Sequence, residues 1–389
     1  MTRDSPSGGQ HQGDGQRRRY VVFDALRCVA AAAVLVGHAF NLFTTNDGPR
    51  VHGWLRLPVI FGSFGGQAVI AFFVLSGFWI SKSIAERHAQ GRWSWSDYAI
   101  DRLSRLWLVL IPGLMLGGIL DVLSLQLARF PYAALGSTIL GGDFAQRLTP
   151  EAFFGDMVFL QKLLVPMFGS NTALWSLANE FWYYLWFPAI VGIVTRRVAL
   201  APSLAAAASM IAFPSLLPGF LCWLTGVGLY AASRRWRAPG WAAWPAMAMG
   251  AGVLATIRWW TSGAELAVAC VVAVVLWCCA DADVRTLRPL AAFGRHASYS
   301  LYVCHIPLLV LAAGLLLPGH RLHLSASAVL EVAGVCAIVL GCAWGFSRLT
   351  EAHTGVVRRR IRAASQRMAP RVRAAWPRPT PQSPRERPG

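Results

Sequence analysis

Apolar runs of about twenty residues, separated by short polar segments, recur from residue 21 to residue 346. Runs of this length are typical of helices that cross a bilayer. The pattern predicts an all-α fold, a polytopic helical membrane protein with about ten transmembrane helices. We expect the spans at residues 21–43, 59–81, 103–127, 172–194, 198–213, 216–233, 241–258, 265–280, 298–317 and 325–346. The segment between the third and fourth spans contains a short amphipathic stretch, which we interpret as interfacial or re-entrant.

The positions of the charged residues predict the direction in which each span crosses the membrane. The 389 residues include 36 Lys and Arg but only 18 Asp and Glu, and most of the cations lie in short loops and in the tails. Because positive loops stay on the cytoplasmic side, both termini are expected there, in a multi-pass protein of the inner (plasma) membrane. We expect a disordered tail over residues 1–19, a transmembrane domain over 20–347, and a basic, Pro-rich tail over 348–389 with a short basic helix.

Composition narrows the classes of function. Only 14% of the residues are charged, which is too few for a soluble domain of this length. Basic residues beside apolar runs indicate anionic lipid as the partner, and no nucleic acid. All eight cysteines fall inside apolar runs without metal-ligand spacing to histidine, so no metal site is expected. Motifs for nucleotide hydrolysis, for a serine nucleophile elbow and for a zinc protease are absent from the sequence.

The first span contains three side chains that hydrocarbon tolerates poorly. Asp24, Arg27 and His38 lie on one stripe of the helix, because Arg27 and His38 are about three turns apart. Ionisable groups on one face of a membrane helix indicate a functional site. His38, near the outer end, is the candidate general base. A structural histidine, an arginine that snorkels to the inner surface, and an aspartate that only neutralises Arg27 remain the alternatives.

Two other spans carry candidate partners. Arg102 and Arg105 stand three residues apart at the inner end of the third span, where both can reach one phosphate. Arginines that only anchor a span at the cytoplasmic surface would show the same pattern. Glu180 lies in the fourth span at a depth similar to that of His38, where it can orient the imidazole, bind an acceptor or pair with an arginine. Asn179 and Ser176 add hydrogen-bonding groups beside it.

Two further polar residues are weaker candidates. Ser76, in VLSGF, is small enough that close helix packing is the leading interpretation. His305, in the ninth span, has no acidic neighbour in sequence, so packing is favoured there too, with a contribution to the site as the alternative.

Five segments in order along residues 20–346 together resemble the membrane-bound acyltransferase 3 family. They are FDALRCVAAAAVLVGH (an Arg-x10-His motif), IAFFVLSGFWIS, DRLSRLW (an Arg-x2-Arg motif), LWSLANEFWYYL and SYSLYVCHIPLL. Ala25 and Cys28 stand where the family usually has glycine. The chain resembles the short, stand-alone form of the family.

The resemblance implies transfer of an acyl group, commonly acetyl from acetyl-CoA, to a hydroxyl of a surface polysaccharide, its lipid-linked precursor or a small molecule. It implies that Arg27 and His38 are the essential pair and that Arg102 and Arg105 bind the donor. We expect acyl-CoA as co-substrate and His38 as general base or covalent acyl carrier. A transporter or flippase of a polar lipid or saccharide is the main alternative, and a non-catalytic scaffold is a third.

Overall fold

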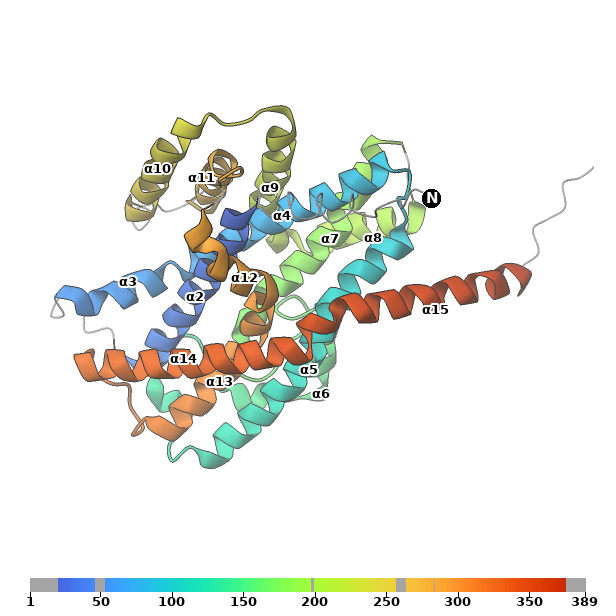
Figure 1. The fold of residues 1–389 in the computed structure, drawn as a ribbon. Coiled ribbons are helices and arrows are strands. Elements are labelled where there is room, and N and C mark those ends of the chain that lie inside the picture. The colour runs from blue at the N-terminus through green and yellow to red at the C-terminus, as the bar shows by residue number, and fades with distance from the viewer. Residues whose placement is uncertain (1–19, 46–52, 197–198, 257–263, 283, 376–389) are drawn as a thin grey trace, which may run out of the picture.

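The computed structural model describes residues 20–45, 53–196, 199–256, 264–282 and 284–375, and its regular elements are helices joined by short 3-10 turns (Figure 1). Apart from two isolated bridges, these residues form no β-structure. The all-α prediction is therefore confirmed. Among the described residues, six helical segments are long and apolar enough to span a membrane, at Val21–Phe43, Gly65–Ala89, Trp95–Leu127, Pro214–Arg235, Ser298–Leu316 and Ala326–Ser365. The count of ten spans stays a prediction.

Most helices follow the predicted spans, with differences at their ends, but the predicted span at 59–81 is divided at Phe64 between a helix at Arg56–Ser63 and one at Gly65–Ala89. The long helices are α2 (Val21–Phe43), α4 (Gly65–Ala89), α5 (Trp95–Leu127), α7 (Trp175–Val194), α9 (Leu217–Arg235), α13 (Ser298–Leu316) and α14 (Ala326–Leu349). Shorter ones are α3 (Arg56–Ser63), α6 (Pro150–Met157), α8 (Leu200–Ala212), α10 (Ala243–Thr256), α11 (Ala264–Cys278) and α12 (Arg288–His296). Helix α5 begins eight residues before the predicted span, because Ser94 caps it by accepting from the Asp97 amide.

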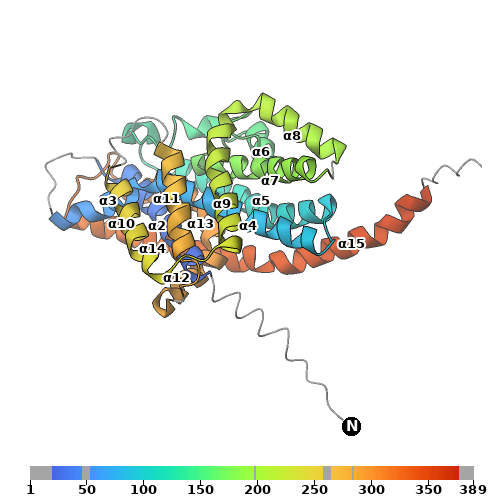
Figure 2. The same cartoon turned by 90° about the horizontal axis from the view of Figure 1, so that it is seen from above.

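Helix α2 lies at the centre and packs against α4, α12 and α13, while α13 packs on α5 and α4 on α9 (Figures 1 and 2). The α4–α9 contact brings two backbones together. A Cβ on Gly77 would stand 2.1 Å from the Trp223 carbonyl oxygen, and one on Gly226 would stand 2.0 Å from that of Val74. Only glycine fits at both positions, so this close approach fixes the neighbouring Ser76 on α4.

The segment after α5 forms a folded cap rather than a span. Arg147 donates to the carbonyl oxygens of Leu140, Gly141 and Gly169, and ties the loop together. Asp156 on α6 is fully buried and accepts from the Phe168 amide. Burial raises the pKa of Asp156 to about 7, against the opposing effect of that hydrogen bond.

The last described helix, α15 (Thr354–Ala375), continues the course of α14 across a 3-10 turn and extends away from the bundle (Figure 1). It is longer than the short basic helix predicted for this tail. It also packs on α5, where the buried carboxylate of Asp101 accepts from Arg362 at 2.6 Å and pairs with Arg87. The predicted disordered tail at residues 1–19, and residues 376–389, lie outside the described residues.

Candidate active site

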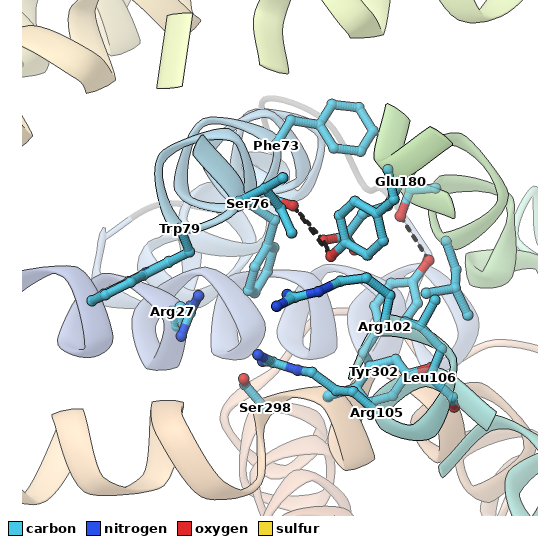
Figure 3. A pocket seen from close by; sticks show the side chains of 16 residues that line it. Arg27, Phe73, Ser76, Trp79, Arg102, Arg105, Leu106, Glu180, Ser298 and Tyr302 are labelled. Carbon is cyan, nitrogen blue, oxygen red and sulfur yellow. Dashed lines mark hydrogen bonds between the residues drawn. The ribbon is translucent and has the colours of Figure 1, made fainter. Parts of the chain in front are cut away.

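A cavity between α2, α4, α5, α7 and α13, which we call the inner cavity, gathers six of the predicted site residues (Figure 3). They come from segments that are far apart in sequence. Aromatic side chains form much of the remaining wall. The six residues are Arg27, Ser76, Arg102, Arg105, Ser176 and Glu180.

Arg27 is held in place from two sides. Its Nη1 donates to Asp24 Oδ1 at 3.2 Å, and its guanidinium stacks over the ring of Trp79 at 5.7 Å. The other oxygen of Asp24 accepts from Arg295 Nε at 3.0 Å. Asp24 therefore sits between two arginines, which matches the neutralising role left open from the sequence.

Arg102 and Arg105 differ from Arg27 because neither forms an ion pair within the described residues. Arg102 stacks near the rings of Tyr98 and Tyr184, and its buried Nε has no hydrogen-bond partner. Asp101, the nearest acid in sequence, is already bound to cations from elsewhere. The two guanidinium groups are thus available to an anionic ligand.

A second pocket, which we call the basic mouth, adjoins the inner cavity and shares four lining residues with it, Arg27, Trp79, Arg102 and Arg105. Figure 3 shows the guanidinium groups of Arg102 and Arg105 pointing to the side of the cavity where Arg27 lies. The lining of the mouth adds further cationic side chains, and Asp24 is its single acid. The added cations are Lys82 and Arg295.

Glu180 is fixed on the α4 side of the inner cavity. Its Oε1 accepts from Ser76 Oγ at 2.5 Å and from the Tyr184 hydroxyl, while Ser76 accepts from Trp223 Nε1 at 3.1 Å. Its Oε2 has no hydrogen-bond partner among the described residues. Those residues also contain no group of three or more His, Cys, Asp or Glu side chains that could hold a metal ion. The expected contact between Glu180 and the His38 imidazole is not formed, since the Ser76 and Tyr184 hydroxyls hold the carboxylate elsewhere.

The far wall of the inner cavity is built by Ser176 and Tyr302. Their hydroxyls lie 2.7 Å apart, and the Tyr302 hydroxyl also donates to the Ala173 carbonyl oxygen. Asn179, which was predicted to bind substrate, does not belong to the lining. Asn179 directly precedes Glu180, and adjacent residues of a helix point about 100° apart, so the Asn179 side chain leaves α7 in another direction from the Glu180 carboxylate.

His38 lies outside the inner cavity and lines another pocket, the outer cavity, together with Asn41, Thr138 and Arg321. Its Nδ1 is 2.9 Å from Nε2 of His305, and the two rings are parallel within 2°. His305 is buried and lies one turn along α13 from Tyr302. One helical turn therefore separates the wall of the inner cavity from the imidazole pair.

Sequence reasoning missed several residues of the site. Tyr184 follows Glu180 by four residues, so i, i+4 spacing on a helix was an available signal for their contact. Trp79 and Ser298 gave no such signal, because only packing between helices brings them to the arginines. Arg295 was hidden in a helix, α12, that was not predicted.

The arrangement suits transfer of a group from a ligand in the inner cavity to a ligand in the outer cavity. Unpaired guanidinium groups at the basic mouth attract phosphates. An imidazole at the outer cavity is suited to remove a proton from a hydroxyl. Together, these sites provide an anion-binding entrance and a base. Arg27, beside the entrance, and His38 are about three turns apart on α2.

Comparison with known proteins agrees with this chemistry. The acyltransferase domain of the acyltransferase 3 family matches residues 20–348. An O-acetyl transferase of Shigella phage Sf6 is 31% identical over 170 residues, which are 42% of this chain and 43% of the phage protein. The match thus spans less than half of that relative, and no solved structure matches the chain. From the domain match, which covers most of the chain, we conclude that this membrane protein belongs to the acyltransferase 3 family of acyltransferases.

Proposed function

We propose that the protein moves an acyl group, acetyl in the first instance, from acyl-CoA to a hydroxyl of a carbohydrate or related acceptor. The observation that carries the proposal is the placement of two free arginines at the basic mouth and of His38 at the outer cavity. Both termini and the basic mouth face the cytoplasm in this proposal, across a plasma membrane spanned about ten times, as the positive loops indicate. The phage relative, named as an O-acetyl transferase, supports acetyl and oxygen as donor group and acceptor atom.

The donor enters through the basic mouth. Its phosphates bind Arg102 and Arg105, neither of which forms an ion pair with a described carboxylate. The pantetheine arm then runs past Arg27 through the inner cavity and beyond Tyr302, so that the thioester covers the one helical turn to the imidazole pair and reaches His38. The aromatic wall excludes water from the thioester and limits its hydrolysis.

The acceptor hydroxyl binds in the outer cavity beside His38. His38 takes the hydroxyl proton as the oxygen attacks the thioester carbonyl carbon, which forms the new C–O bond. The C–S bond then breaks, and the imidazolium returns the proton to the CoA thiolate. The products are an ester and free CoA, with no net change in the protein.

The test is transfer from labelled acetyl-CoA by purified full-length protein in lipid nanodiscs, with a panel of lipid-linked and soluble oligosaccharides. We expect His38→Gln to lower kcat about 100-fold or more while acetyl-CoA still binds. His353→Gln is the matched control, because His353 lies in neither cavity. Unchanged turnover by His38→Gln would refute the base assignment. Saccharide movement across the bilayer without ester formation would favour a flippase.

A further inference from the structure

The position of the proton on His305 follows from its neighbours. Its Nδ1 lies 3.0 Å from the Leu301 carbonyl oxygen and 2.9 Å from that of Tyr302. Carbonyl oxygens only accept hydrogen bonds, so Nδ1 must carry hydrogen. In the neutral ring, Nε2 of His305 is then an acceptor.

This assignment fixes the proton on the second ring. Nε2 of His305 and Nδ1 of His38 are 2.9 Å apart, which is a hydrogen-bond distance. Because the His305 nitrogen accepts, the His38 nitrogen donates and carries hydrogen. Neutral His38 therefore keeps its lone pair on Nε2, and this nitrogen has no hydrogen-bond partner among the described residues.

The reverse arrangement requires a cationic His305. The His305 side chain is buried, with 1% of its surface exposed, and no described carboxylate forms an ion pair with either ring. A buried, unpaired charge is far more costly than a neutral imidazole. The stable arrangement is therefore a pair of neutral rings, with hydrogen on Nδ1 of His305 and on Nδ1 of His38.

We propose that His305 is a positioning residue that holds His38 in the tautomer with a bare Nε2 at the outer cavity. The proposal rests on the proposed function, because only a transfer reaction uses this lone pair as a base. In this role His305 orients the catalytic imidazole of His38 through a hydrogen bond to its second nitrogen. The proton of His305 is in turn held by the carbonyl oxygens of its own helix. His305 acts through His38 and does not contact the acceptor.

The tautomer can be read without any assay of activity. The full chain is labelled with ¹⁵N-histidine, reconstituted in nanodiscs and studied by NMR, and the signal that disappears in His38→Gln is assigned to His38. We expect hydrogen on Nδ1 and none on Nε2 in the wild type. In His305→Phe, which removes the acceptor, we expect a mixture of tautomers or the opposite one. Hydrogen on Nε2 of wild-type His38 would overturn the proposal.

Kinetics supply the second readout. With acetyl-CoA and the oligosaccharide panel as the probes and CoA release as the signal, we expect His305→Phe to lower kcat about tenfold, as loss of one such hydrogen bond implies. The Michaelis constant for acetyl-CoA should change less than about twofold, because the donor binds elsewhere. His305→Gln, whose amide oxygen can accept from His38, should recover most of kcat.

The outcomes separate the two proposals. Equal loss of activity in His305→Phe and His305→Gln, with the His38 tautomer unchanged, would show a merely structural role and overturn the inference. A wild-type protein that releases no CoA with any acceptor of the panel would refute the proposed function, while the NMR result would still decide the proton order.

Discussion

Arg102 offers the sharpest test of how the donor is held. Its guanidinium is half-buried, has no ion-pair partner in the described part of the chain, and leaves a buried Nε without a hydrogen bond. A charge-assisted hydrogen bond to phosphate contributes about 1.5–3 kcal/mol. Since about 1.4 kcal/mol corresponds to a factor of ten, Arg102→Ala should raise the Michaelis constant for acetyl-CoA about 10- to 100-fold. Arg105 is exposed, so Arg105→Ala should have a smaller effect.

The assay compares two donors that share the thioester but not the phosphates. Acetyl-CoA carries the nucleotide phosphates and acetyl-pantetheine lacks them. Arg102→Ala should weaken use of acetyl-CoA and leave the kinetics of acetyl-pantetheine unchanged, with kcat nearly constant for both. Arg92→Ala is the matched control, because Arg92 is an exposed arginine whose side chain hydrogen-bonds Gln90 and lines neither the inner cavity nor the basic mouth. An equal loss with both donors would refute the phosphate role.

Four further predictions concern charge and packing. Glu180→Gln removes the only acid of the inner cavity lining, so the Michaelis constant for acetyl-CoA should fall about two- to tenfold; a rise would contradict this reasoning. The pKa of Asp156 is about 7 in the folded protein and about 3.9 unfolded, so stability should fall as pH rises from about 4 to about 7, and Asp156→Asn should remove that slope in thermal unfolding. Gly226→Ala should lower Tm by several degrees, while Gly228→Ala, with open space around its Cβ, should not. Arg362→Gln should release α15 from α5 and speed its proteolysis, and an unaltered digestion pattern would count against the ion pair.

Hydrophobic periodicity located most of the helices, because a helix in lipid must be apolar over its full length. The α13 span was predicted to within one residue at its end. The folded cap around Arg147 was not foreseen, since its bonds are to backbone carbonyls and leave no pattern in the sequence. Helix α12 is too short and polar for a span, and its place beside Asp24 depends on Gly294, which allows contact with the α2 backbone.

The sequence predicted which residues form the candidate site better than it predicted which of them contact one another. Charged residues in apolar spans are costly, and this cost pointed to Arg27, Glu180 and His38. Their partners were assigned from depth along each helix, which says nothing of the direction in which a side chain points. Glu180 was therefore expected at the imidazole, whereas His305 lies there. Rotation of each helix about its axis, set by packing, was the missing information.

The contact between Asp101 and α15 makes the order of synthesis matter. A ribosome completes Asp101 at a point 261 residues before Arg362, whereas its other cation, Arg87, precedes it by 14 residues. Until the last helix is made, the carboxylate keeps Arg87 as its ion-pair partner and lacks Arg362. The contact between α5 and α15 therefore forms only after all the other described helices have been synthesised.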